Sequence, residues 1–159
     1  MAKRNTKPVD SELVLQKIRY FCSYQERCIR DVEGKLKDWT VQKKLIPFII
    51  KTLKDEGYLD EERFAKVYAG GKFRVNKWGR ERIGFELRLK GIGDELIRRG
   101  LEEIDEQDYL KVLRALILKK QKEFLQEDDF PVREKIINFA HGKGYEFELI
   151  LSIIKELKI

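Results

Sequence analysis

The sequence has few of the residues that most often bind metals or form covalent cross-links. Its 159 residues contain one histidine, His141, and two cysteines, Cys22 and Cys28. A tetrahedral site of the zinc type needs four such ligands at short spacings, so these three residues cannot provide one. Both cysteines fall at apolar helical positions, and we interpret them as reduced packing residues. His141 stands near an expected helix end and is interpreted as a surface residue, so we predict no metal site and no cofactor.

Enzyme motifs and membrane signals are missing as well. The sequence has no glycine-rich phosphate loop, no dinucleotide-binding fingerprint and no nucleophile elbow. We therefore expect no catalytic residues and no enzyme. No apolar run approaches the roughly 20 residues that span a bilayer, and the first residues do not form an apolar signal segment. These absences favour a cytoplasmic protein without a membrane partner.

Charged residues are abundant instead. Lys and Arg number 34 and Asp and Glu number 28, which gives a formal net charge of +6. Hydrophobic residues make up 42% of the chain, enough to bury a core, and this balance argues against global disorder. Lys3, Arg4 and Lys7 have almost no apolar neighbours, so we expect residues 1–10 to form a mobile basic tail.

The remaining pattern is helical throughout. Apolar residues recur at intervals of three and four residues, which is typical of amphipathic helices. Helix starts are indicated by a Ser-x-x-Glu capping box at Ser23 and by N-cap residues at Asp60 and Asp105. Pro47 falls early in an expected helix over residues 41–56, where the loss of one donor is tolerated. These signals predict nine helices in three sets of three.

The three sets share sequence landmarks. The expected middle helices end at Lys35-Leu36, Lys90-Gly91-Ile92 and Lys143-Gly144-Tyr145, and matching junctions occur at Leu59-Asp60-Glu61 and Ile104-Asp105-Glu106. A period of about 50 residues in a helical chain indicates tandem units that pack on their neighbours. We predict an all-α fold, a tandem array of three three-helix repeats that is elongated and curved. Its repeats are expected over residues 11–58, 59–104 and 105–159.

The excess of positive charge is concentrated in the middle repeat. Residues 72–90 include seven basic residues and only two acidic ones, with aromatic residues between them in the sequence. Cations neutralise phosphates and rings can stack on bases, so this composition favours an anionic partner such as nucleic acid, although charge alone does not distinguish DNA, RNA and an acidic protein. The candidate binding residues are Lys72, Arg74, Lys77, Trp78, Arg80, Arg82, Arg88 and Lys90.

Two features of this segment have alternative interpretations. Arg80, Gly84 and Arg88 share one helical stripe, on which a small residue between two guanidinium groups could admit an anionic backbone; a solvated helix face is the alternative. Trp78 could stack on a base or pack on the start of the following helix. The acidic run Glu102–Asp108 could contact a basic partner, but a favourable interaction with a helix dipole explains it more simply.

Two segments resemble the signature of the RecX family of bacterial recombination regulators. These are GYLDEERFAKVY at residues 57–68 and KWGRERIGFELRLKGI at residues 77–92. The residues that match the family pattern and that we interpret as structural are Asp60, Arg63, Phe64, Gly79, Ile83, Leu87 and Gly91. Asp60 is expected to be an N-cap, and Arg63 to pair with a nearby acid. The chain departs from the pattern where Arg80 replaces a frequent proline and where Gly70-Gly71-Lys72 replaces a Ser-Arg pair.

The resemblance implies a regulator of DNA repair, recombination and the SOS response that is not an enzyme. Members of the family bind filaments of the RecA recombinase on single-stranded DNA, lie along the filament groove and limit its growth or activity. The implied partners are therefore the RecA filament and single-stranded DNA, with double-stranded DNA as a further ligand, and a monomer is the default state. The alternatives are a helical nucleic-acid-binding protein that acts without a recombinase and an adaptor for acidic proteins.

Overall fold

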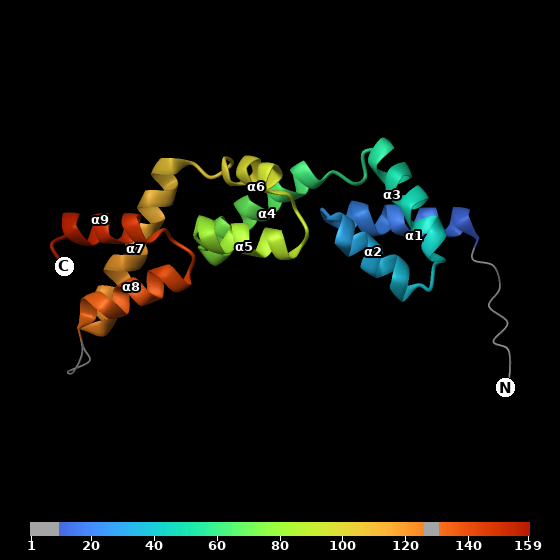
Figure 1. The fold of residues 1–159 in the computed structure, drawn as a ribbon. Coiled ribbons are helices and arrows are strands. Elements are labelled where there is room, and N and C mark those ends of the chain that lie inside the picture. Colours follow the sequence, from blue (N-terminus) through green and yellow to red (C-terminus); the bar gives the residue numbers. More distant parts are fainter. Residues whose placement is uncertain (1–9, 126–130) are drawn as a thin grey trace, which may run out of the picture. The chain divides into compact units, whose positions relative to one another are not determined.

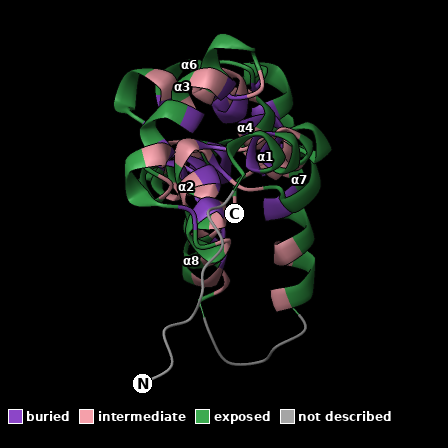
Figure 2. Cartoon of the chain, turned by 90° about the vertical axis from the view of Figure 1, so that its right-hand side faces the viewer, coloured by how far each residue is buried: buried purple, intermediate pink, exposed green. Residues whose placement is uncertain are grey.

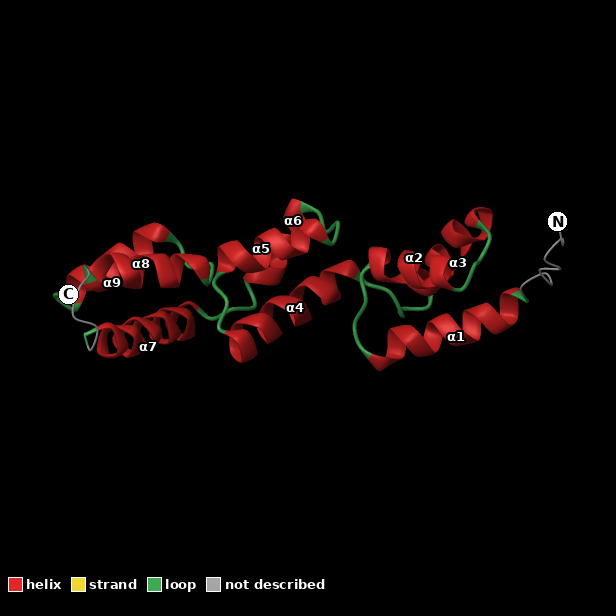
Figure 3. Ribbon diagram, turned by 90° about the horizontal axis from the view of Figure 1, so that it is seen from below, coloured by secondary structure: helices red, strands yellow, loops and turns green. Residues whose placement is uncertain are grey.

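The computed structural model describes residues 10–125 and 131–159, and within these ranges every regular element is a helix (Figure 3). The helices are α1 (Ser11–Tyr24), α2 (Ile29–Asp38), a 3₁₀ turn (Lys43–Leu45), α3 (Ile46–Asp55), α4 (Glu61–Asn76), α5 (Arg80–Leu89), α6 (Asp94–Leu101), α7 (Glu106–Phe124), α8 (Val132–Gly142) and α9 (Phe147–Glu156) (Figure 1). The all-α fold expected from the periodicity is confirmed. None of the described helices combines the length and the apolar character needed to cross a bilayer.

The chain divides into two compact units, Met1–Phe64 and Ala65–Ile159. The division falls inside α4, whose first turn belongs to the first unit. The basic tail predicted for residues 1–10 lies outside the described residues, except for Asp10, whose side chain caps α1 by accepting a hydrogen bond from the backbone N–H of Glu12 (3.1 Å). The three-repeat division of the chain stays a prediction.

The first unit is built around one apolar cluster. Helices α1, α2 and α3 turn their apolar stripes toward each other, so that buried residues follow the inward side of each helix (Figure 2). The cluster includes Val14, Leu15, Ile18, Cys22, Val32, Leu36, Ile49 and Leu53. Removal of this apolar surface from water is the main stabilising contribution to the unit.

The start of α2 differs from the prediction. Ser23 was expected to open this helix, but it lies within α1, where its hydroxyl donates to the carbonyl of Tyr20 (2.8 Å). Helix α2 begins at Ile29 after Cys28, whose backbone N–H donates to the Asp31 carboxylate (3.0 Å). The capping box therefore exists one turn later than the serine suggested, because Ser23 bonds back into its own helix.

The second unit contains most of α4 and all of α5 to α9. Its buried side chains come from every one of these helices and include Phe73, Ile83, Leu87, Ile97, Tyr109, Leu113, Ile117, Ile136, Ile150 and Ile154. Tyr109 and Tyr145 are the largest fully buried side chains of the described residues. Unlike the aliphatic residues, they bring hydroxyl groups into the interior, and these hydroxyls need hydrogen-bond partners.

Helices α2, α5 and α8 are each followed by a residue in the left-handed region of backbone conformation. These residues are Thr40 (φ 57°), Gly91 (φ 82°) and Gly144 (φ 100°). In each case the next N–H reaches back to a helical carbonyl: Val41 to Leu36, Ile92 to Leu87 and Tyr145 to Ala140. From the sequence, Lys35-Leu36 was paired with Lys90-Gly91, and this pairing is wrong by about one helical turn. The residue that corresponds to Gly91 is Thr40, which was missed because it is a threonine and not a glycine.

The two matching junctions place acidic residues at equivalent helix ends. Asp60 accepts a hydrogen bond from the Arg63 N–H (3.0 Å), and Asp105 accepts one from the Asp108 N–H (3.0 Å), so both aspartates are N-caps as predicted. The glutamate that follows each of them reaches the start of the preceding middle helix. Glu61 accepts from the Ile29 N–H of α2 (3.1 Å), and Glu106 accepts from the Arg80 guanidinium of α5 (2.6 Å).

Candidate nucleic-acid and partner interface

A group of cations and aromatic rings joins α4 to α5. Lys72 Nζ lies 5.5 Å from the ring centre of Tyr68 and 4.8 Å from that of Trp78. Arg82 Cζ lies 4.2 Å from the ring centre of Trp78, and Lys90 Nζ lies 5.7 Å from that of Tyr68. All four distances are within the roughly 6 Å range of cation–π contacts. We call these five residues the cation–aromatic cluster.

The cluster lies in a segment whose positive charge is not balanced locally. Among the residues that the structure describes, no ion pair joins a carboxylate to Lys72, Arg74, Lys77, Arg82 or Lys90. Burial and the negative charge of Glu86 raise the pKa of the Tyr68 hydroxyl, whereas Arg82 acts in the opposite direction. Tyr68 therefore stays neutral at physiological pH and adds no negative charge to the cluster.

The turn that carries Trp78 is held by backbone hydrogen bonds to a distant turn. The N–H of Gly79 donates to the carbonyl of Lys143 (2.8 Å), and the N–H of Glu81 donates to the carbonyl of Gly144 (2.9 Å). A Cβ on Gly79 would lie 2.2 Å from the carbonyl carbon of Gly144, closer than real Cβ atoms come. Glycine at this position thus allows the start of α5 to lie directly against the turn between α8 and α9.

Three buried rings pack next to the same turn. The ring centres of Phe73 and Tyr109 are 5.8 Å apart, and those of Tyr109 and Tyr145 are 5.0 Å apart. The Tyr145 hydroxyl donates to the carbonyl of Lys77 (2.9 Å). Burial raises the pKa of both tyrosines, so their hydroxyls remain protonated and able to donate. The position of the cluster therefore depends on Tyr109 of α7 and on the turn between α8 and α9.

Arg80 is tied into this interior network. Its backbone N–H donates to the Tyr109 hydroxyl (3.0 Å), which in turn donates to Glu146 (2.5 Å). Its guanidinium carbon lies 3.9 Å from the Tyr109 ring centre, and its Nη2 lies 2.6 Å from Glu106. These contacts favour a structural role for Arg80 over the contact with an anionic partner that the sequence suggested.

The expected anion-binding stripe on α5 has a buried residue at its centre. Gly84 is buried, and a Cβ at this position would lie 3.7 Å from Ile97 and 4.0 Å from Leu101, because this face of α5 packs on α6. Arg88, at the end of the stripe, is exposed and pairs with Asp94 (3.1 Å). An exposed pair of this kind contributes less than about 1 kcal/mol, so Arg88 can exchange Asp94 for another anion at little cost.

The remaining predicted residues are exposed, and one residue of the cluster was not predicted. Arg74 extends back over its own helix, and its Nη1 lies 2.7 Å from the point where a Cβ added to Gly70 would be. Lys77 occupies the turn between α4 and α5 with a positive φ of 57°. Tyr68 was not singled out from the sequence as a binding residue, although its i, i+4 spacing to Lys72 on the same helix could have linked it to this cation.

The same segment matches a known protein family. A family profile described as "RecX, second three-helix domain" matches residues 60–101. A "Regulatory protein RecX" of Clostridium acetobutylicum is 27% identical over 132 residues, which cover 80% of this chain and 61% of that protein. The protein of the same name from Bacillus cereus is 29% identical over 144 residues, which cover 91% of this chain and 53% of that protein. These matches support the resemblance of this chain to the RecX family.

Solved RecX structures have the same fold. The crystal structure of RecX from Lactobacillus salivarius superimposes with a TM-score of 0.83 at 23% identity, over 92% of this chain and 96% of that one. A second crystal structure, of a regulatory protein RecX, gives a TM-score of 0.82 at 22% identity, over 91% of this chain and 71% of that one. The chain spans between half and two thirds of the length of the curated RecX relatives named above.

The residues of the RecX signature lie in or next to α4 and α5, where they are buried or form helix ends. Phe64, Ile83 and Leu87 are buried, Gly79 allows the close approach described above, and Gly91 ends α5. Arg63 donates to Glu26 (2.6 Å) and to the carbonyl of Gly57 (2.9 Å). The expected roles of Asp60 as an N-cap and of Arg63 as a partner of a nearby acid are confirmed.

The histidine and the cysteines occupy the kinds of position expected for them. His141 is exposed near the end of α8, with its Nε2 3.6 Å from Glu81. Cys22 and Cys28 are buried free thiols, and burial raises the pKa of Cys22 to about 11. Over residues 10–125 and 131–159 no group of three or more His, Cys, Asp or Glu side chains is placed to hold a metal ion.

Proposed function

We propose that this protein binds filaments of the RecA recombinase on single-stranded DNA and lowers the ATPase and strand-exchange activity of the recombinase. The observation that carries the proposal is the cation–aromatic cluster in the segment that bears the RecX signature. Its cations have no carboxylate partners in the described structure and can neutralise DNA phosphates or an acidic surface of the recombinase.

The geometry favours contact with a charged backbone over stacking on bases. Trp78 is half-buried, and Lys72 and Arg82 both lie over its ring. We infer that Trp78 orients the two cations and does not insert between bases. The cluster would then read the shape and charge of its partner and not its base sequence. Trp78 is therefore assigned to positioning, and Lys72, Arg82 and Lys90 to direct contact.

The test measures ATP hydrolysis by RecA on single-stranded DNA as the protein is added. A triple variant, Lys72→Ala with Arg82→Ala and Lys90→Ala, is compared with a control that loses the same charge from α3 and the turn before it, Lys44→Ala with Lys51→Ala and Lys54→Ala. We expect the wild type and the control to inhibit alike, whereas the cluster variant requires at least about a tenfold higher concentration, a loss of about 1.4 kcal/mol.

Binding to single-stranded DNA in the absence of RecA separates this proposal from the alternative, a nucleic-acid-binding protein that acts without a recombinase. If the protein acts without a recombinase, it will bind DNA tightly and leave RecA activity unchanged, and the proposal is then wrong. If the cluster contacts phosphates, the triple variant will also reduce the slope of log affinity against log salt by about 0.7 for each lost contact. An unchanged slope together with weaker inhibition assigns the cluster to the recombinase surface, which agrees with the proposal.

A further inference from the structure

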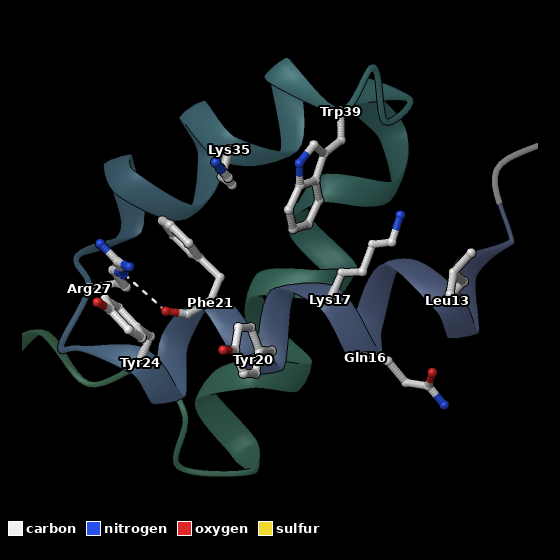
Figure 4. Close-up of a pocket in the computed structure, with 9 residues that line it drawn as sticks. All are labelled: Leu13, Gln16, Lys17, Tyr20, Phe21, Tyr24, Arg27, Lys35 and Trp39. Carbon is white, nitrogen blue, oxygen red and sulfur yellow. Dashed lines mark hydrogen bonds between the residues drawn. The ribbon is translucent and has the colours of Figure 1, made fainter.

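The first unit carries a hollow that shares no residue with the cation–aromatic cluster. It lies between α1 and α2, has a volume of about 650 Å³, and is lined by the aromatic side chains of Tyr20, Phe21, Tyr24 and Trp39 (Figure 4). We call it the α1–α2 groove. Tyr20 is 71% exposed and Tyr24 74% exposed, although both lie on a helix whose other face is fully buried. Clustered exposed rings of this kind mark a surface that a partner covers.

The charged residues that line the groove are all cations. The Arg27 guanidinium carbon lies 3.8 Å from the ring centre of Phe21, and its Nε donates to the Phe21 carbonyl (3.0 Å). Lys35 Nζ lies 5.5 Å from the Phe21 ring and 5.8 Å from the Trp39 ring, and the exposed Lys17 lines the same hollow. No acidic side chain is among the residues that line the groove. The occupant must therefore offer negative charge around an apolar centre.

The same contacts favour a protein segment over a nucleic acid. Base stacking needs a free ring face, but Arg27 already covers Phe21, and Lys35 lies over both Phe21 and Trp39. Among the described rings of the groove, only those of Tyr20 and Tyr24 are left without a cation over the ring. Tyr, Trp, Phe and Arg are the residues enriched in the centres of protein–protein interfaces. An apolar groove between two helices is also the usual receptor for the apolar side of an amphipathic helix.

We propose that the α1–α2 groove binds an acidic amphipathic helix of a partner protein. Large apolar side chains of this helix enter the hollow beside Tyr20 and Tyr24, and its carboxylates meet Lys17, Arg27 and Lys35. The N-terminal residues of this chain itself contain Lys3, Arg4 and Lys7 and would repel these cations, so they do not fit the groove. The proposal goes beyond the regulatory function above, because it requires neither DNA nor the cation–aromatic cluster.

The test uses a fluorescein-labelled model helix that has leucine at positions i, i+3, i+4 and i+7 and glutamate at most others. A matched peptide has lysine in place of each glutamate. Binding is followed by fluorescence anisotropy and by the emission of Trp39 in a Trp78→Phe background, in which it is the one remaining tryptophan. We expect the acidic peptide to bind at least about tenfold more tightly than the basic one.

Variants on exposed positions locate the binding site without disturbing the fold. The double variant Tyr20→Ala with Tyr24→Ala should weaken binding of the acidic peptide by about tenfold or more, as expected of aromatic residues at the centre of an interface. Lys17→Glu should weaken it severalfold. The controls are Phe48→Ala and Lys51→Glu, which change exposed residues of α3 that do not line the groove, and they should leave the affinity unchanged.

Several results would overturn the proposal. Equal affinity for the two peptides would remove the electrostatic argument, and binding that survives the double tyrosine variant would place the peptide elsewhere. If a thymidine oligonucleotide changes Trp39 emission and the tyrosine variant abolishes this change, the groove is a nucleic-acid site. If the measured molecular mass doubles as the protein concentration rises, and the double tyrosine variant removes this doubling, the occupant is a second copy of the chain. None of these readouts involves RecA, so they are independent of the regulatory function.

Discussion

The two units of this protein join their helices in different ways. In the first unit, α1, α2 and α3 meet through one aliphatic cluster, with charged contacts such as Arg19 with Glu56 (2.7 Å) at its edge. In the second unit, backbone hydrogen bonds at Gly79 and Gly144 and the hydroxyls of two buried tyrosines add to the apolar packing. Helices can therefore be held together by side-chain contacts alone, as in the first unit, or also by backbone hydrogen bonds between turns, as in the second.

This difference corresponds to what each unit presents at its surface. The turn that carries Trp78 is fixed from several sides, so the cations around it have defined positions before a partner binds. The α1–α2 groove is instead lined by exposed rings that no other described element covers. We therefore expect the second unit to be the more sensitive to changes at buried polar contacts, and the first unit to tolerate changes outside its aliphatic cluster.

Gly79→Ala is expected to have the largest effect on the second unit. The added Cβ would overlap with the carbonyl of Gly144 and would break the two backbone hydrogen bonds beside it. Overpacking and the lost hydrogen bonds together should lower the free energy of unfolding by about 2–4 kcal/mol. Urea unfolding, followed by the emission of Trp78 in a Trp39→Phe background, measures this change.

Gly34→Ala is the matched control in the first unit. Gly34 lies within α2, and apart from its chain neighbours and the backbone of its own helix no heavy atom of the described residues would come within 4 Å of an added Cβ. Alanine is the better helix former, so this variant should be neutral or up to about 1 kcal/mol more stable. Equal effects of the two substitutions on the free energy of unfolding would mean that the turn at Gly144 can shift without loss of stability. The proposed contrast between the units would then be wrong.

Tyr109→Phe tests the hydroxyl contribution to the same unit and should have a smaller effect. The variant keeps the ring but leaves the Arg80 N–H and Glu146 without their shared partner. A buried group left without its hydrogen bond costs about 1–3 kcal/mol. Tyr20→Phe in the first unit removes an exposed hydroxyl and should change stability by less than about 0.5 kcal/mol. Thermal unfolding of the two variants side by side makes the comparison, and a smaller loss for Tyr109→Phe than for Tyr20→Phe would contradict it.

Much of the fold could be predicted from the sequence because its signals are local. Apolar spacing predicts the helices, and Asp60 and Asp105 are N-caps in the structure because capping depends on residues within one turn. The start of α2 was misplaced because Ser23 can bond either forward as a cap or backward into its own helix. The repeat landmark at Thr40 was missed because threonine rarely adopts a positive φ.

The candidate site could be predicted only in part, because charge in the sequence does not reveal tertiary partners. Lys72, Arg82 and Lys90 lie together around two rings, as a basic and aromatic segment suggests. Arg80 has the same composition around it, but Glu106 and Tyr109, which hold it, are more than twenty residues away in the chain. The α1–α2 groove gave no sequence signal, because its tyrosines are off the apolar stripe of α1.

Alkaline pH provides the smallest expected effect and acts on the first unit. Burial raises the pKa of Cys22 from 9.0 to about 11, so above about pH 9 the unfolded thiol loses its proton before the folded one does. The folded state then binds more protons than the unfolded state, and stability falls as the pH rises from about 9 toward 11. Between about pH 8 and pH 9.5 this linkage lowers the free energy of unfolding by less than about 1 kcal/mol.

The tyrosines with raised pKa values, Tyr68, Tyr109 and Tyr145, all lie in the second unit and titrate in the unfolded chain only near pH 10. Trp39 emission in a Trp78→Phe background should therefore report a falling urea midpoint over this range, and Cys22→Ala should remove the fall. A midpoint that falls equally with and without Cys22 would show that another group controls the alkaline response.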